Sequence, residues 1–204
     1  MNLEILENAL KKRWTYKYKW GRKQSNEWDE STNFIYNTKT FSSLLEQIKH
    51  FDVNLQNYAL NRWYNFWSAM GVEYIFSIHK IVVPNINRYD KLVDFKINNI
   101  PFDHKTSIFP KGFGKPIEYA KKNKIEMIKW LYINQSQEGR KHLKNRLFIV
   151  LYDSICHDHW KLKAEIFLLK KAIDAYIEKF DKANLCKIKF GDDIVYSDII
   201  WLER

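Results

Sequence analysis

The sequence predicts a mixed α/β fold, in which a central mixed sheet is flanked by helices and preceded by a basic, aromatic N-terminal extension. Segments with apolar residues at every third or fourth position alternate with short β-branched runs, which indicates helices interleaved with strands. One run, residues 147–151, is apolar on both faces, as is typical of a buried central strand. Hydrophobic residues make up 46% and charged residues 28% of the 204 residues, which excludes a disordered or fibrous chain.

The N-terminal extension, residues 1–55, is expected to pack on the core. A short helix is predicted over residues 1–12, where leucines recur at helical spacing. Rings then stand at every second position with basic or hydroxyl residues between them, and this period of two predicts a strand with an aromatic face. These rings are Trp14, Tyr16, Tyr18 and Trp20. Residues 21–38 are polar and predict a loop, and Thr40 can cap a helix over 41–51.

The core, residues 56–204, is expected to form one compact domain together with this extension. Its first helix contains Gly71 as a candidate interruption, and Pro116 suits the first turn of a later helix. In chain order, the predicted elements are a helix over 56–79, a β-meander over 80–107, a helix over 116–133, the strand at 147–151, an amphipathic helix over 160–180 and a strand at 194–201.

The chain is strongly basic, with 34 Lys and Arg against 24 Asp and Glu and a net charge of +10. This charge predicts a polyanionic partner, and we expect DNA. The two cysteines, Cys156 and Cys186, make no disulfide framework and fit a reducing cytoplasm. Because we find neither a signal peptide nor an apolar run of the ~20 residues that cross a bilayer, we expect a cytoplasmic protein without membrane association.

The most informative segment, residues 91–107, predicts a β-hairpin. Two strand-like runs flank Asn98 and Asn99, and asparagine tolerates the positive φ values of a two-residue hairpin turn. Counting back from this turn places Asp94 directly opposite Asp103. The other pairs in this register are Ile97 with Ile100, Phe95 with Phe102, and Val93 with His104.

Alternation along the hairpin places Asp94, Asp103 and Lys105 on one face, away from the apolar side chains. Two carboxylates opposite each other on a ladder repel, and a divalent cation would offset this repulsion. Mg²⁺ prefers oxygen ligands and is commonly held by one or two carboxylates, while an ammonium group can polarise a phosphate or orient water. The alternative is an exposed polar hairpin, whose surface ion pairs contribute little to stability.

Asp94, the hairpin turn and the triplet Asp103-His104-Lys105 resemble the signature of the PD-(D/E)XK nuclease superfamily, over about residues 56–155. The resemblance implies a restriction-endonuclease-like core and Mg²⁺-dependent hydrolysis of DNA, as by a type II restriction endonuclease, with Mn²⁺ able to replace Mg²⁺. It implies that Asp94 and Asp103 bind the metal, that the backbone carbonyl of His104 adds a ligand, and that Lys105 is catalytic. It implies no small-molecule cofactor.

Many members of this superfamily also carry an acidic residue on the helix before the meander. Glu73 matches it, because it is the sole acidic residue between Asp52 and Asp90 and lies on the predicted helix. The resemblance makes Glu73 a further metal ligand and catalytic residue, and the alternative is a surface glutamate near a helix end. The proline that often precedes the first aspartate is Val93 here.

Basic residues beside the aromatic strand and in loops are the expected DNA contacts, because Lys and Arg neutralise phosphates and rings can stack on unpaired bases. The alternative is that the rings belong to the core and the lysines to a solvated face. The expected contacts are Lys17, Lys19, Arg22, Lys23, Lys111, Lys115, Lys161 and Lys163.

Other interpretations stay open from the sequence. Residues 156–159, Cys-His-Asp-His, contain zinc-ligand types, but their spacing fits no zinc motif and favours a loop. A non-catalytic nucleic-acid-binding protein, or a nuclease-fold subunit of a larger defence or repair complex, would also account for the charge and the rings. Cutting both strands of a duplex would favour a homodimer, because one such site cuts one strand at a time.

Overall fold

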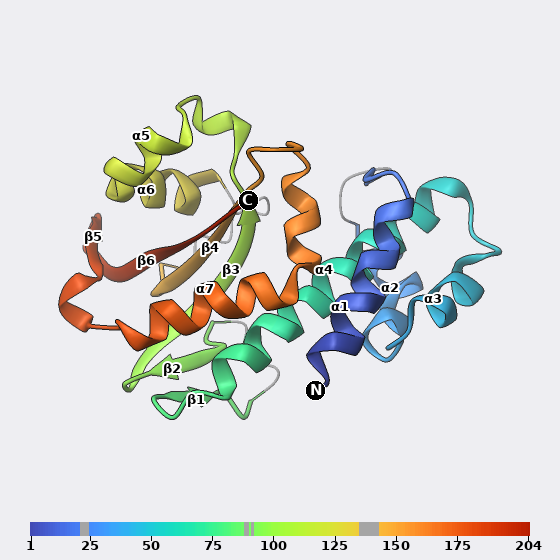
Figure 1. Ribbon diagram of the computed structural model, residues 1–204, viewed down its shortest axis with the longest axis horizontal. Coiled ribbons are helices and arrows are strands. Elements are labelled where there is room, and N and C mark those ends of the chain that lie inside the picture. The colour runs from blue at the N-terminus through green and yellow to red at the C-terminus, as the bar shows by residue number, and fades with distance from the viewer. Residues whose placement is uncertain (21–24, 88–89, 91, 135–142) are drawn as a thin grey trace. The chain divides into compact units, whose positions relative to one another are not determined.

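The computed structural model of the protein describes residues 1–20, 25–87, 90, 92–134 and 143–204. The chain forms two compact units, whose elements are labelled in Figure 1. The first unit comprises Met1–Val72 and Lys163–Phe167, and the second comprises Glu73–Leu162 and Leu168–Arg204. Most of the long helix that the sequence predicts over 56–79 therefore belongs to the N-terminal unit.

The first unit is helical in its described residues. Its elements are α1 (Leu3–Lys11), the 3-10 helix η1 (Lys12–Thr15), α2 (Asn26–Ser31), the 3-10 helix η2 (Asn33–Tyr36), α3 (Phe41–Ile48) and the larger part of α4 (Val53–Ser77). The predicted cap of α3 is confirmed, since the Thr40 hydroxyl accepts the backbone N–H of Ser43 at 3.1 Å. The helices bury apolar side chains against one another, among them Leu10, Leu44 and Trp63.

The aromatic strand predicted at the N-terminus is wrong. The loop predicted over 21–38 is also wrong from residue 25 onward, while residues 21–24 lie outside the described residues. Trp14 lies in η1, residues 16–20 have no regular secondary structure, and α2 and η2 occupy the polar segment that follows. Ser25 caps α2 by accepting the backbone N–H of Trp28, which explains how a polar segment begins a helix.

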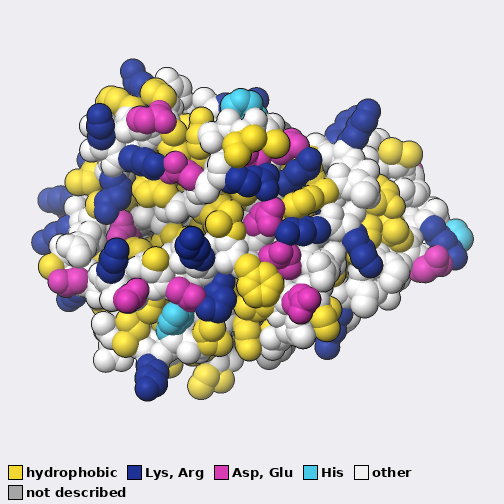
Figure 2. Space-filling model, in the orientation of Figure 1, with side chains coloured by type: hydrophobic (Ala, Val, Ile, Leu, Met, Phe, Trp, Pro, Cys, Tyr) yellow, Lys and Arg dark blue, Asp and Glu magenta, His cyan; other side chains and the backbone are white. Residues whose placement is uncertain are grey.

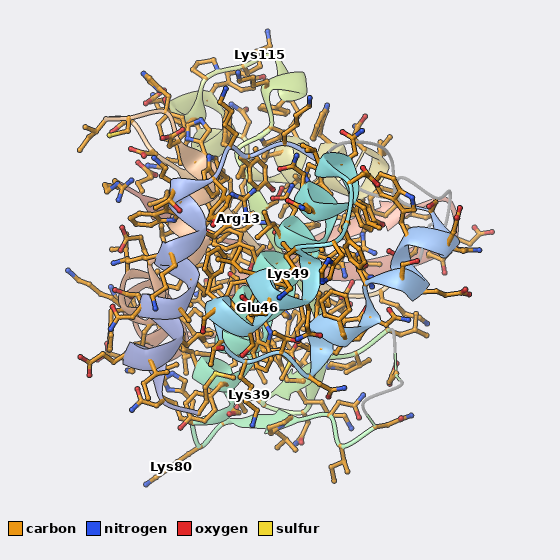
Figure 3. All side chains as sticks on the ribbon, turned by 90° about the vertical axis from the view of Figure 1, so that its right-hand side faces the viewer. Arg13, Lys39, Glu46, Lys49, Lys80 and Lys115 are labelled. Carbon is orange, nitrogen blue, oxygen red and sulfur yellow. The ribbon has the colours of Figure 1, made fainter. Side chains whose placement is uncertain are left out.

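Two buried side chains explain why residues 16–20 are not a strand. Arg13 donates hydrogen bonds to the backbone carbonyls of Tyr16 and Lys17 at 2.7 and 3.0 Å, and Asn61 of α4 donates to the carbonyl of Lys19 at 2.8 Å. Arg13 and Asn61 are both fully buried, and Figure 3 shows Arg13 among packed side chains. The carbonyls that a strand would offer to a neighbouring strand are thus used by side chains.

The long helix predicted over 56–79 is confirmed as α4, and Gly71 does not interrupt it. A side chain at Gly71 would place its Cβ 2.7 Å from Leu6 and 3.2 Å from Ile166. Glycine at this position therefore allows α1 and the segment Lys163–Phe167 to approach α4 closely.

The second unit is built on a six-stranded mixed sheet, which confirms the mixed α/β class and the central sheet. Its strands are β1 (Val82–Pro84), β2 (Phe95–Ile97), β3 (Ile100–Ile108), β4 (Arg146–Tyr152), β5 (Cys186–Phe190) and β6 (Asp193–Glu203), in the spatial order β1-β2-β3-β4-β6-β5. β4 is parallel to β3 and to β6, and the outer pairs are antiparallel. The predicted central strand is confirmed as β4, which is buried from Arg146 through Leu151.

Helices cover both faces of this sheet. The 3-10 helix η3 (Lys111–Phe113), α5 (Ile117–Lys122) and α6 (Lys124–Asn134) follow β3, and α7 (Ile166–Glu178) follows η4 (His159–Ala164) and precedes η5 (Lys182–Asn184). In Figure 1, α5 and α6 lie on one face of the sheet and α7 on the other. In the described parts of the chain, no helix combines the length and apolarity required to cross a membrane.

Three elements of the second unit differ from the sequence prediction. The helix predicted over 116–133 is divided at Asn123, which ends α5 with its N–H on the Tyr119 carbonyl and begins α6 with its own carbonyl. The amphipathic helix predicted from residue 160 starts as a 3-10 helix and becomes α-helical only at Ile166. Strand β5 was not predicted, because residues 186–190 alternate lysines with apolar residues over only five positions.

Candidate metal centre and active site

The predicted hairpin turn is confirmed, and so is the register between Phe95 and Phe102. Asn98 and Asn99 have φ values of +46° and +64°, as a two-residue hairpin turn of type I′ requires. Phe95 pairs with Phe102, and the pairing continues through the turn as predicted. The tight turn holds β2 and β3 side by side and thereby fixes which residues meet at the open end of the hairpin.

At that end, Asp94 contacts His104 rather than lying in a ladder pair with Asp103. β2 begins at Phe95, so the paired residues of β2 and β3 do not include Asp94. The Asp94 carboxylate oxygen Oδ2 accepts the backbone N–H of His104 at 2.7 Å and lies 2.8 Å from its ring nitrogen Nδ1. The predicted direct opposition of Asp94 and Asp103 is therefore wrong, because the Asp94 side chain bonds the β3 backbone one residue further on.

Glu73, near the C-terminal end of α4, joins this pair. One ligand atom each from Glu73, Asp94 and His104 lies within 4.8 Å of the other two, and all three residues belong to the second unit. His104 is buried and its ring stacks on Phe95 with centroids 6.0 Å apart, while Glu73 and Asp94 are half-buried. A helix and a hairpin thus bring two carboxylates and an imidazole together.

The two carboxyl groups have opposite pKa shifts. Burial raises the pKa of Glu73, and the charge of Asp94 adds to this effect, against the opposing charges of His104 and Lys105. Burial would also raise the pKa of Asp94, but the hydrogen bonds and charge of His104, with a smaller contribution from Lys105, lower it below its usual value. The charge of Lys105 therefore acts on both carboxylates.

In EDTA, Glu73→Gln is expected to be more stable than the parent protein at neutral pH. The raised pKa means that protonated Glu73 is favoured in the fold; this stabilisation is complete below the unfolded pKa near 4.5 and is lost as the pH rises through the folded pKa. Gln resembles the protonated acid at every pH. Thermal unfolding between about pH 4 and pH 8 should show a stability gap that widens with pH. Glu118→Gln on exposed α5 is the control, and an equally pH-dependent gap there would contradict the assignment.

Asp103 and Lys105 form a second group around Arg146 at the start of β4. Asp103 Oδ2 accepts from Arg146 Nε at 3.0 Å, and its Oδ1 lies 3.0 Å from Lys105 Nζ. Asp103 and Arg146 are both buried, whereas 48% of the Lys105 side chain is exposed. The parallel pairing of β3 with β4 sets Asp103 opposite Arg146, so the ion pair follows from the sheet register.

The predicted catalytic residues therefore fall into two sets in one unit. The prediction that Asp94 shares a face with Asp103 and Lys105 is wrong, because Asp94 contacts His104, whose side chain alternates with theirs along β3. Glu73 and Asp94 lie together, and Asp103 and Lys105 lie together. Two partners were missed by sequence reasoning: the imidazole of His104, for which only the backbone carbonyl was expected to bind metal, and the side chain of Arg146. The available sequence indication for Arg146 was a charged residue directly before an apolar run, since a charge that enters a buried strand requires a partner.

The donor set of Glu73, Asp94 and His104 can hold a divalent cation. Carboxylate oxygens suit Mg²⁺ and Mn²⁺, and an imidazole nitrogen favours the first-row transition metals. His104 Nδ1 lies 2.8 Å from Asp94 Oδ2, so an ion held by all three residues would lie between the carboxylate and this ring nitrogen, in place of their direct contact. Asp103 is not a member of this group in the described residues.

The predicted DNA contacts are distributed over both units. Lys17, Lys19, Lys111 and Lys115 are exposed, and Figure 3 shows Lys115 at the edge of the molecule. Arg22 and Lys23 lie outside the described residues. Figure 2 shows Lys and Arg scattered among Asp and Glu on the visible face rather than gathered in one patch.

Two of the predicted contacts, Lys161 and Lys163, are engaged with other side chains. Lys161 Nζ lies 2.6 Å from an Asp158 carboxylate oxygen. Lys163 donates to the Asn65 side-chain oxygen at 2.6 Å, and burial lowers its pKa to about 8. Lys163 therefore packs within the first unit, and its ammonium is committed to Asn65.

The loop interpretation of residues 156–159 fits the structure. His159 accepts the backbone N–H of Asp153 through Nδ1 at 2.8 Å, and Cys156 is exposed. The one group of metal-ligand types that converges in the described ranges is Glu73, Asp94 and His104, which excludes this loop.

Comparison of the chain with protein-family models, with curated proteins and with solved structures gave no significant match in any of the three. Membership of the PD-(D/E)XK superfamily therefore stays a prediction from the hairpin residues themselves.

Proposed function

We propose that the protein is a metal-dependent deoxyribonuclease that hydrolyses phosphodiester bonds with Mg²⁺ or Mn²⁺. The observation that carries the proposal is the convergence of charged side chains in the second unit. Glu73, Asp94 and His104 bring three ligand atoms within 4.8 Å of one another, and the charge of Lys105 acts on both carboxylates. A cluster of metal-ligand types that includes His104, followed directly in β3 by Lys105, supplies the kinds of groups that metal-assisted hydrolysis of a phosphodiester uses.

Glu73, Asp94 and the His104 ring would hold the ion in this proposal. A bound divalent ion lowers the pKa of water and stabilises charge on a phosphate. Because an imidazole nitrogen favours transition metals, we expect Mn²⁺ to bind more tightly than Mg²⁺. The hydrogen bond from the His104 backbone and the contact with its ring keep Asp94 in the ionised form that a metal ligand needs.

Lys105 is the proposed catalytic residue, because its half-exposed ammonium is accessible to a phosphate or an attacking water. Asp103 holds this ammonium through one carboxylate oxygen, and Arg146 holds Asp103 through the other. The family resemblance makes Asp103 a metal ligand, but its two cationic contacts favour a positioning role toward Lys105.

The proposal is tested by incubating the protein with supercoiled plasmid, linear duplex, branched DNA and single strands in Mg²⁺, in Mn²⁺ or in EDTA. We expect cleavage in either metal and none in EDTA. Asp94→Asn is expected to be inactive, whereas Asp193→Asn, an exposed acid at the start of β6, serves as the matched control and should keep full activity.

Cleavage that persists in EDTA, or that survives Asp94→Asn, would overturn the proposal. Absence of cleavage of all four substrates in both metals would instead favour the non-catalytic nucleic-acid-binding protein. That protein would bind DNA with an affinity that falls with salt and does not depend on metal.

A further inference from the structure

The first unit contains an aromatic pocket that the proposed catalytic residues do not use. Its volume is about 230 Å³, which is below the roughly 300–1,000 Å³ of sites for drug-sized ligands. Every lining residue belongs to the first unit. The lining side chains are Trp20, Asp29, Ile35, Tyr36, Tyr58, Arg62, Asn65 and Phe66.

Four rings give the pocket its apolar character. Trp20 meets Tyr58 edge to face with centroids 5.9 Å apart, and Tyr36 meets Phe66 in the same way at 4.8 Å. Tyr58 is buried, but 39% of Trp20 and 45% of Tyr36 are exposed. Two large rings are therefore partly open to solvent while each is held in place by an inner ring, an arrangement that suits stacking against a planar ligand.

Arg62 of α4 lies among these rings with its hydrogen-bonding groups in use. Its terminal nitrogens donate to the Asp29 carbonyl, to Thr32 and Asn33 and to the Tyr36 hydroxyl, and its Nε lies 3.3 Å from the Asp29 carboxylate. The guanidinium also lies 5.4 Å from the Tyr36 ring centroid. The pocket therefore offers ring faces around an Arg62–Asp29 ion pair, and Arg62 is not available to read hydrogen bonds from a ligand.

Hydrogen bonds from two buried side chains fix the backbone of the segment that precedes Trp20. The buried side chains of Arg13 and Asn61 hold the backbone carbonyls of the irregular segment 16–19, as described above. The side chains of Lys17 and Lys19, immediately before Trp20, remain exposed. Two cations therefore precede a partly exposed ring in a segment whose carbonyls at residues 16, 17 and 19 are already hydrogen-bonded to side chains.

We propose that this pocket binds one unpaired base of a single-stranded nucleic acid, with Lys17 and Lys19 contacting the adjacent phosphates. Ring faces bind any base by stacking, and lysines neutralise the backbone on either side without reading sequence. The inference deepens the proposed nuclease function, on which it rests for its biological role, by naming DNA with an unpaired or extruded base as the preferred substrate class.

The test measures binding in EDTA, where no cleavage is expected, by fluorescence anisotropy of a labelled oligo-dT and of a duplex of equal length. The protein should bind the single strand more tightly. Trp20→Leu keeps an apolar side chain but removes the ring, and should weaken single-strand binding about tenfold, whereas Trp20→Phe should retain most of the affinity. A 2-aminopurine in the strand should be quenched by the parent protein and not by Trp20→Leu.

Tyr16→Leu is the matched control, because Tyr16 is a 38% exposed ring of the same segment that does not line the pocket. It should change affinity by less than about twofold, and unfolding temperatures of all variants show whether they fold. Lys17→Gln and Lys19→Gln should each make the plot of log affinity against log salt concentration less steep by about 0.7. This change should be the same for strands of every base composition.

Equal effects of Trp20→Leu and Tyr16→Leu, or tighter binding of the duplex, would overturn the pocket assignment and leave the nuclease proposal standing if metal-dependent cleavage is seen. Conversely, a ring-dependent preference for single strands without cleavage in Mg²⁺ or Mn²⁺ would support the pocket and overturn the nuclease. The two proposals therefore fail on separate measurements.

Discussion

Replacing Lys105 with alanine is expected to lower the rate of metal-dependent DNA cleavage by about 10²–10³-fold, the loss typical of removing one group that stabilises charge in a transition state. The side chain is half-exposed, and its ammonium lies 3.0 Å from an Asp103 carboxylate oxygen. Single-turnover cleavage of a labelled substrate measures the chemical step, and calorimetric titration with Mn²⁺ measures metal binding. The rate should fall while metal affinity stays close to that of the parent protein.

The chain supplies its own control for this experiment. Lys96 is the lysine of the other Asp-x-Lys triplet, Asp94-Phe95-Lys96, and is exposed on β2. Lys96→Ala removes the same charge from the same hairpin and should leave the cleavage rate within about twofold. A loss of rate as large as that of Lys105→Ala would indicate a general electrostatic effect and contradict a catalytic role for Lys105.

Asp103→Asn separates the two roles considered for Asp103. If Asp103 positions Lys105, the cleavage rate falls and Mn²⁺ affinity is retained. If Asp103 is a metal ligand, as the family resemblance implies, Mn²⁺ affinity falls as well. The contacts of Asp103 with Arg146 and Lys105 lead us to expect the first result.

Arg146→Met is expected to destabilise the second unit by about 3–5 kcal/mol, because it leaves the Asp103 carboxylate buried without its guanidinium partner. Both side chains are only 8% exposed, and the Nε–Oδ2 distance is 3.0 Å. The Arg146 guanidinium also lies 5.1 Å from the Tyr132 ring centroid, so its loss removes a cation–π contact as well. Urea unfolding followed by circular dichroism measures the change in the free energy of unfolding.

A double variant and an exposed pair make this prediction specific. Asp103→Leu combined with Arg146→Met removes both charges and should recover most of the lost stability, since an apolar pair can replace a buried ion pair. Lys121→Met breaks the Lys121–Glu203 pair, whose side chains are 40% and 38% exposed, and should cost less than about 1 kcal/mol. If Arg146→Met and Lys121→Met lowered the free energy of unfolding equally, burial of the Asp103–Arg146 pair would add nothing to the cost of breaking it.

Features governed by residues close in the chain were predicted correctly. The Asn98-Asn99 turn fixes the register of β2 and β3, and Thr40 caps its helix, because in each case the controlling side chain acts on backbone within a few residues. The central position of β4 also follows from the sequence, since a strand without a polar face must be covered on both sides. The helix that bears Glu73 is also confirmed, whereas the role of Glu73 is a prediction from the family resemblance.

The predictions that failed depend on contacts between distant residues. Rings at alternate positions from Trp14 to Trp20 have the period of a strand, but Asn61 on α4, 42 residues beyond Lys19, holds the Lys19 carbonyl and also accepts a hydrogen bond from the buried Arg13. Nothing in the local sequence specifies those hydrogen bonds. Periodicity reports which side chains share a face, and it reports strand structure only where a neighbouring strand is available.

The sequence by itself determined that an acidic hairpin follows a helix bearing Glu73, because turn chemistry and helical period are local. Only the tertiary structure decided which residues each of these acids contacts. Asp94 and Glu73 meet His104, whereas Asp103 is held by Arg146, 43 residues further along the chain. That division depends on where β2 ends and on the parallel register of β3 with β4, and backbone pairing between strands far apart in sequence sets both.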